Sequence, residues 1–132
     1  MPFVSRVRVV IVSPALADAN NGNWQTARRW QRLLSERHSA RIVNDWPADS
    51  RGDDGREHAD QVMLALHGRR SASAIDAWAR SRPGRGLAVV MTGTDLYRDL
   101  AVDDRVRRSL SVAQKIVVLQ PEGLAALPAD LR

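Results

Sequence analysis

The chain has 132 residues, of which 44% are hydrophobic and 27% charged, which is enough for one folded domain with a hydrophobic core. It contains no cysteine, so disulfides, thiolate catalysis and Cys-ligated metal centres are excluded. No run reaches the roughly 20 apolar residues that span a bilayer, and the amino-terminal run lacks the cleavage site of a secretion signal. We therefore expect a soluble, cytoplasmic protein that has no membrane partner.

The first third of the chain predicts a strand, a helix and a second strand. Residues 7–12 form a β-branched run typical of a buried strand. We expect Asn23 to cap a helix that carries Ala27, Trp30 and Leu34 on one apolar face. A brief strand follows at 40–43.

The segment 44–60 is polar and rich in turn residues, and we interpret it as a long loop in which Trp46 fills an edge of the core. A third strand at 61–66 leads to a helix capped by Ser71 or Ser73. Pro83 and Gly84 end this helix, and a fourth strand spans 87–91.

Asp103 or Asp104 caps the next predicted helix, which precedes a fifth strand at 115–119. Pro121 stands where a last helix would start. This alternation predicts an α/β fold, a Rossmann-like open parallel sheet of about five strands with helices on both faces. Such domains usually need a further strand or a second domain to complete their packing, so we expect the chain to be part of a longer protein.

The residues with functional side chains follow the carboxyl ends of the predicted strands. In open parallel sheets these ends meet at one edge, where ligands bind. The candidate substrate-binding residues there are Gly22, Asn23, Arg69, Arg70, Thr92, Gly93, Thr94, Arg98 and Gln120, and the candidate catalytic residues are His67 and Asp95.

Each candidate also has a purely structural interpretation. Gly22 at a helix start would let a phosphate approach backbone amides, or it serves a turn. His67 is a general base, a phosphate donor or a capped core histidine. Arg69 and Arg70 bind an anion near a helix N-terminus, or form a solvated pair. Asp95 contacts a sugar or acceptor, or simply starts a helix behind Thr94.

The charge is carried almost entirely by arginine. The formal net charge is +5, and Lys115 is the only lysine. Guanidinium groups suit bidentate binding of phosphate-like oxyanions, whether these belong to a small molecule or to nucleic acid. Because the arginines are scattered along the sequence, we favour the small molecule.

Several motifs of known chemistry are missing. The chain has neither GxGxxG nor GxxxxGK[ST], so no dinucleotide or P-loop fingerprint is present, and we expect no cofactor. The three histidines are far apart in sequence, without HExxH spacing, which disfavours a metal site.

Four segments in order resemble the amino-terminal domain of GT-B-type glycosyltransferases. More narrowly, they are similar to the glycosyltransferase family that contains the selenosugar synthase of selenoneine biosynthesis. The segments are NNGNWQTARRW (20–30), LALHGRRSASAI (64–75), VVMTGTDLYRDL (89–100) and IVVLQPEGLAALP (116–128). They cover nearly the whole chain in order and spacing.

The resemblance implies an enzyme with a second domain, outside this chain, that binds the nucleotide of a UDP-sugar. The first domain supplies the acceptor side of the cleft, and selenophosphate attacks the anomeric carbon and releases UDP. Gly22 and Asn23 would then lie near the diphosphate. The residues implied as acceptor or phosphate contacts are His67, Arg69, Arg70, Thr92 to Asp95 and Arg98.

The chain departs from many related sugar transferases by carrying Thr92, where they have a histidine before the glycine of the fourth-strand motif. This moves attention for acid–base chemistry to His67. Without its partner domain, the chain alone should not turn over a UDP-sugar. The alternative function is a small basic Rossmann-like module that binds an anion or nucleic acid without catalysis.

Overall fold

The computed structural model describes residues 6–14, 22–46, 60–91, 100, 103–119, 122–127 and 129–131. The strands are β1 (Arg8–Val12), β2 (Ser39–Val43), β3 (Val62–Leu66), β4 (Leu87–Met91) and β5 (Lys115–Val118). The helices are α1 (Gly22–Leu34), α3 (Ala72–Ser81), α5 (Asp104–Val112), α6 (Glu122–Ala126) and the short 3-10 helix η4 (Ala129–Leu131). The predicted strands all form, within one residue of their expected ends.

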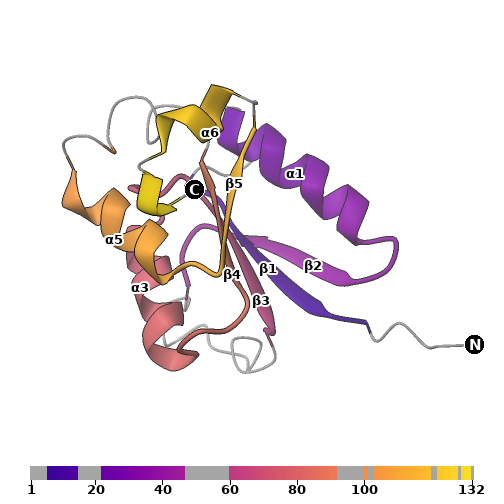
Figure 1. Ribbon diagram of the computed structural model, residues 1–132. Coiled ribbons are helices and arrows are strands. Elements are labelled where there is room, and N and C mark those ends of the chain that lie inside the picture. The colour runs from indigo at the N-terminus through magenta and orange to yellow at the C-terminus, as the bar shows by residue number, and fades with distance from the viewer. Residues whose placement is uncertain are drawn as a thin grey trace, which may run out of the picture.

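All the strand pairs are parallel, and the strand order is β2-β1-β3-β4-β5 (Figure 1). The chain moves outward from β1 to β2, then returns across β1 to β3 and continues to β4 and β5. The order therefore reverses between β1 and β3, which makes their carboxyl ends a topological switch point. The predicted Rossmann-like open sheet of the α/β class is confirmed.

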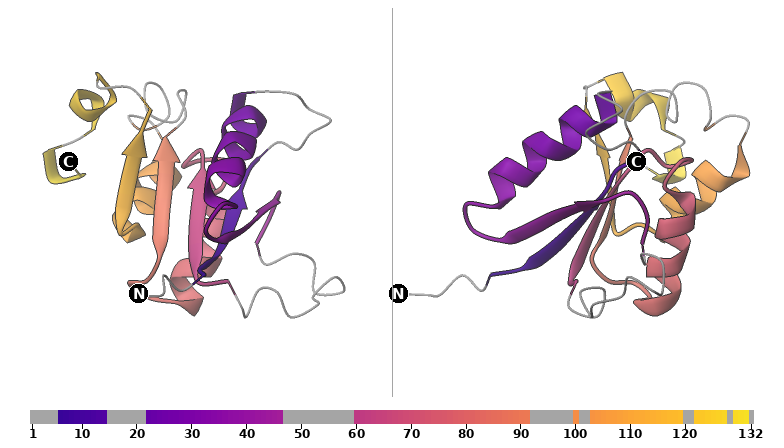
Figure 2. Two further views of the ribbon diagram at one scale, coloured as in Figure 1. Left: turned by 90° about the vertical axis from the view of Figure 1, so that its right-hand side faces the viewer. Right: turned by 180° about the vertical axis from the view of Figure 1, so that it is seen from behind.

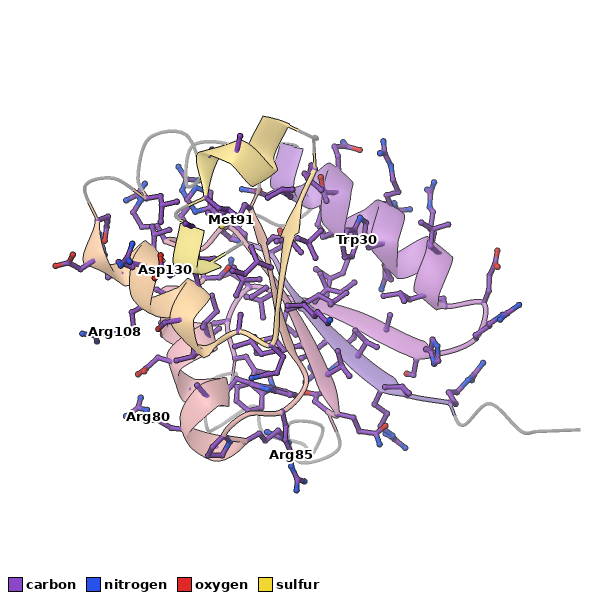
Figure 3. The ribbon with its side chains drawn as sticks, in the orientation of Figure 1. Trp30, Arg80, Arg85, Met91, Arg108 and Asp130 are labelled. Atoms are coloured by element: carbon purple, nitrogen blue, oxygen red, sulfur yellow. The ribbon has the colours of Figure 1, made fainter. Side chains whose placement is uncertain are left out.

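The two faces of the sheet carry different helices, as Figure 2 shows, because connections that run in opposite directions across a sheet with right-handed crossovers leave it on opposite sides. On one face Ala27, Trp30 and Leu34 of α1 pack against Val9 and Ile11 of β1. Figure 3 shows Trp30 between α1 and the sheet.

On the opposite face, α3 and α5 cover the alternate side chains of the same strands. Val10 and Val12 of β1 join Ile75 and Trp78 of α3 and Leu110 of α5 in one buried cluster. Successive side chains of a strand point to opposite faces, so each central strand contributes to both clusters. Because the central strands are buried on both faces, their sequences are continuous apolar runs.

Trp46 lies inside the core rather than only at its edge. Its ring centroid is 4.9 Å from that of Trp78, and the Arg82 guanidinium lies 4.4 Å from the Trp78 centroid. The indole Nε1 donates to Asp60 Oδ2 at 3.0 Å, and Asp60 also pairs with Arg41. The hydrogen bond from Trp46 to Asp60 therefore links the residues on either side of the segment 47–59, which lies outside the described residues.

The predicted cap of α1 is wrong, and that of α3 is right in position but not in its hydrogen bond. Helix α1 begins at Gly22, so Asn23 lies in its first turn and does not precede it. Ser71 occupies the N-cap position of α3, but its hydroxyl makes no capping bond and donates to Leu66 O at 2.5 Å. Asp103, by contrast, caps α5 as expected, with its side chain accepting from Arg105 N–H.

Among the described residues, no helix combines the length and the apolar character needed to cross a membrane.

The turn before β4 offers a matched pair of glycines with positive φ, Gly84 at 70° and Gly86 at 62°. A Cβ on Gly84 would meet nothing within 4 Å, whereas one on Gly86 would lie 2.6 Å from Gln61 O. We expect Gly84→Ala to lower the free energy of unfolding by about 1–2 kcal/mol through backbone strain alone. Gly86→Ala should lose about 1–3 kcal/mol more through the clash with β3. Urea denaturation measures the free energy of unfolding of both variants. Equal losses would contradict the close approach of Gly86 to Gln61 O.

Candidate functional site

The switch point brings the start of α1 and the turn after β3 to the same edge of the sheet. Figure 2 shows the arrowheads of the strands and the start of α1 at one end of the molecule. Gly22 opens α1 there and is exposed, and a Cβ on it would meet no atom within 4 Å. The described structure therefore has room for a side chain at this position. Close approach of a ligand to the backbone would be a separate reason for a glycine here.

The turn between β3 and α3 is closed by hydrogen bonds to its surroundings. His67 N–H donates to Val90 O of β4 at 2.9 Å, and Ser71 N–H donates back to His67 O at 3.0 Å. The Ser71 hydroxyl binds the last carbonyl of β3, at Leu66. Buried backbone groups that leave a strand need such partners, and this turn supplies them within a few residues.

His67 is buried, with 2% of its surface exposed, and has a positive φ of 73°. Its Nδ1 accepts the backbone N–H of Arg70 at 3.1 Å, so in this arrangement the proton of the neutral ring is on Nε2. A non-glycine residue in the left-handed region costs on the order of 1–3 kcal/mol, and the surrounding structure must maintain it. Nδ1 is therefore engaged in shaping the turn and is not available as a base.

A buried hydroxyl joins this turn to α5. Ser109 Oγ donates to Gly68 O at 2.8 Å, across 41 residues of sequence, and Ser109 is 3% exposed. The bond connects the first turn after β3 to the middle of the neighbouring helix. It fixes the distance between α3 and α5 at the point where both helices face the carboxyl edge.

The arginines of the turn line a hollow between α3 and α5, the α3–α5 groove, with a volume of about 510 Å³. Arg69 and Arg70 face it from the turn, and Arg105 and Arg108 face it from α5. Figure 3 shows Arg108 extending from α5 into solvent. Arg107, next in sequence, turns away and pairs with Asp130 at 3.0 Å. Four arginines thus border one hollow.

Asp103 lies beside this cluster. Hydrogen bonds from the Arg105 side chain and backbone lower the pKa of its carboxyl, and the charge of Arg69 lowers that pKa further. The distance from Arg105 Nη2 to Asp103 Oδ2 is 2.8 Å. The carboxylate therefore orients Arg105 and partly offsets the positive charge at this end of α5.

The structure brings together only part of the predicted site. Arg69 and Arg70 line the same groove as Arg105 and Arg108. The sequence analysis did not single out Arg105 or Arg108. Helix α1, with Gly22 and Asn23 at its start, packs on the other face of the sheet. The remaining predicted residues fall outside the described ranges: Thr92, Gly93, Thr94, Asp95, Arg98 and Gln120. The spacing of Arg105 and Arg108, one helical turn apart, was a usable signal, because it places them on one face of α5.

A second basic surface lies on the outer side of α1. A shallow hollow of about 340 Å³ there is lined by Arg28, Arg29 and Arg32, with Gln25 and Leu33. All three arginines are exposed. They lie on a single helix with no second element opposite them in that lining, unlike the arginines of the α3–α5 groove.

Within the described ranges, no group of three or more histidine, aspartate or glutamate side chains is placed to hold a metal ion.

A scan of the chain against models of known protein families gives no match, and a search of curated proteins finds none that matches it.

The first site prediction concerns the role of His67. We expect His67→Ala to lower the free energy of unfolding by about 1–3 kcal/mol, because Arg70 N–H loses its acceptor in a buried turn. His67→Asn should lose less, since asparagine tolerates the left-handed region and offers an oxygen acceptor. Urea denaturation of both variants measures the difference. Unchanged stability in His67→Ala would refute the role in the turn.

The second site prediction concerns the contribution of Asp103 to the pH dependence of the stability of the fold. Its pKa is lowered on folding from the ordinary value of 3.8, so it stabilises the fold above that pH. The contribution is lost as the pH falls through the lowered pKa. Asp103→Asn keeps an N-cap acceptor but removes the charge, so the variant should be less stable than wild type at pH 7 and approach it at acid pH.

Denaturation curves between pH 2 and 7 measure this difference, with Asp104→Asn as the matched control that removes one neighbouring charge and leaves the bonds to Arg105 intact. Parallel pH profiles of wild type and Asp103→Asn would contradict the assignment.

Proposed function

We propose that the chain is the acceptor-side half of a GT-B-type glycosyltransferase that transfers a hexosyl group from a UDP-sugar to selenophosphate. Its sequence segments resemble that family, and its Rossmann-like sheet is the architecture such a half requires. The observation that carries the proposal is the β3–α3 turn, which presents Arg69 and Arg70 at the carboxyl edge of the sheet, beside the switch point. Ligands of open parallel sheets bind at this edge.

A selenophosphate acceptor is compatible with a His67 whose Nδ1 is already hydrogen-bonded within the turn. In the proposed reaction selenium attacks the anomeric carbon, the bond from that carbon to the UDP oxygen breaks, and UDP leaves with the bonding electrons. Hydrolysis of the selenium–phosphorus bond then gives the selenosugar and inorganic phosphate. Selenophosphate is already a strong nucleophile, so the step needs groups that hold the anion more than it needs a general base.

Within this proposal the residues of the edge have distinct tasks. Arg69 and Arg70 bind the acceptor oxyanion, and backbone amides at Gly22 and Asn23 lie near the diphosphate of the donor. The donor nucleotide is bound by the second domain of the longer protein. Asp95, Thr92 to Thr94, Arg98 and Gln120 remain proposed contacts, on segments outside the described residues.

The test is UDP release by the full reading frame that contains this chain. We expect release from UDP-glucose or UDP-N-acetylglucosamine that depends on selenophosphate, and a loss of at least tenfold in the Arg69→Gln, Arg70→Gln double variant. The matched control is Arg29→Gln with Arg32→Gln, which removes the same charge from α1. Release that ignores the acceptor would refute the selenosugar reaction, and no release from either sugar would refute the transferase.

A second candidate is favoured by the arginine face of α1. Arg28, Arg29 and Arg32 are exposed, and no ion pair to any of them occurs within the described part of the chain. Such a face suits a basic module that binds an anionic polymer without catalysis. Under this alternative, affinity for an oligonucleotide falls steeply with salt because counterions are released on binding.

A further inference from the structure

The α3–α5 groove has more positive charge on its walls than its carboxylates balance. Among the described residues, Asp76 lines the groove and Asp103 lies beside it. Asp76 pairs with Arg80 at 3.0 Å, and Asp103 pairs with Arg105 at 2.8 Å. Arg70 and Arg108 have no carboxylate partner among the described residues. Arginines that border one hollow without an anion repel one another, and a bound anion relieves that repulsion.

The walls also include apolar surface. Ala72 of α3 and Val112 of α5 are partly exposed and line the groove together with Ser73, whereas Ile75 is almost fully buried. The volume of about 510 Å³ falls within the range of pockets that take small organic ligands. A bare ion would leave this apolar surface wet, so the shape suits an anion that carries a small organic group.

The groove is held open by bonds that do not involve its arginines. The Ser109 hydroxyl binds Gly68 O, and the Ser71 hydroxyl binds Leu66 O, so the turn, α3 and α5 are mutually fixed. Side chains that are held near their bound positions lose less entropy when a ligand arrives. These bonds fix the backbone positions from which the arginines of the groove extend, whereas the arginines of α1 lie along a single helix.

We propose that the α3–α5 groove binds a phosphorylated small molecule. Arg70 and Arg108 bind the phosphate as bidentate donors, Arg69 and Arg105 add positive charge, and the organic group lies against Ala72 and Val112. The groove shares Arg69 and Arg70 with the proposed acceptor contacts, but its test measures binding and does not require sugar transfer. A nucleic acid would follow an extended basic track, whereas these arginines surround a single hollow.

The test is isothermal titration calorimetry of the chain with phenyl phosphate and with inorganic phosphate, at constant ionic strength. Phenyl phosphate should bind more tightly than inorganic phosphate, because its ring covers the apolar wall. The Arg70→Gln, Arg108→Gln double variant should bind phenyl phosphate at least tenfold more weakly. Both arginines are exposed, so the variant should fold, and circular dichroism checks this. The single variant Arg108→Gln should also bind phenyl phosphate more weakly than wild type, by a smaller factor than the double variant.

The matched control is Arg37→Gln with Arg85→Gln, two exposed arginines outside the lining of the groove, which removes the same charge and should change the affinity less than twofold. Equal weakening by the two double variants would overturn the proposal, because it would reduce the effect to net charge. Failure to detect phenyl phosphate binding at millimolar concentration would also overturn it. Displacement of phenyl phosphate by an oligonucleotide without terminal phosphates would assign the groove to nucleic acid instead. None of these outcomes depends on UDP release.

Discussion

The turn from β3 into α3 is closed by three kinds of bond: backbone bonds to β4, a histidine nitrogen that accepts a backbone N–H, and serine hydroxyls that bind backbone carbonyls. The serine bonds are buried and the histidine bond is partly buried, and an unmade hydrogen bond in such surroundings is costly. His67 must adopt a left-handed backbone for these bonds to form together. This constraint sets the direction in which the chain leaves the sheet. It therefore decides where the guanidinium groups of Arg69 and Arg70 lie.

Positive charge is distributed over the two faces of the sheet in different ways. On one face, α1 carries its arginines outward along a single exposed helix, while its apolar side packs on the strands. On the other, arginines from a turn and from α5 meet across a hollow whose walls are tied together by Ser109. Charge on a single face acts mainly through its long-range field, but charge around a hollow can bind one ligand with defined geometry. The proposed binding functions rest on this difference.

The apolar pattern was sufficient for most of the architecture. Runs such as 87–91 are buried on both faces, so they show continuous hydrophobicity, and parallel strands joined by helices are the arrangement that such runs favour. The first residues of the helices were harder to predict from the sequence. Asn23 and Ser71 are good capping residues, yet α1 starts at Gly22, and the Ser71 hydroxyl binds a strand carbonyl instead. A local preference of about 1 kcal/mol is easily overridden when a buried carbonyl needs a donor.

The sequence by itself determined the α/β class and the positions of the five strands, because these depend on local periodicity and on the geometry common to parallel sheets. Only the tertiary structure decided that Arg69 and Arg70 meet Arg105 and Arg108. That pairing depends on which side of α5 faces α3, and a buried bond between residues 41 positions apart fixes it. Long-range contacts of this kind leave no periodic signal in the chain, since they arise from how the helices pack and not from the pattern within either helix.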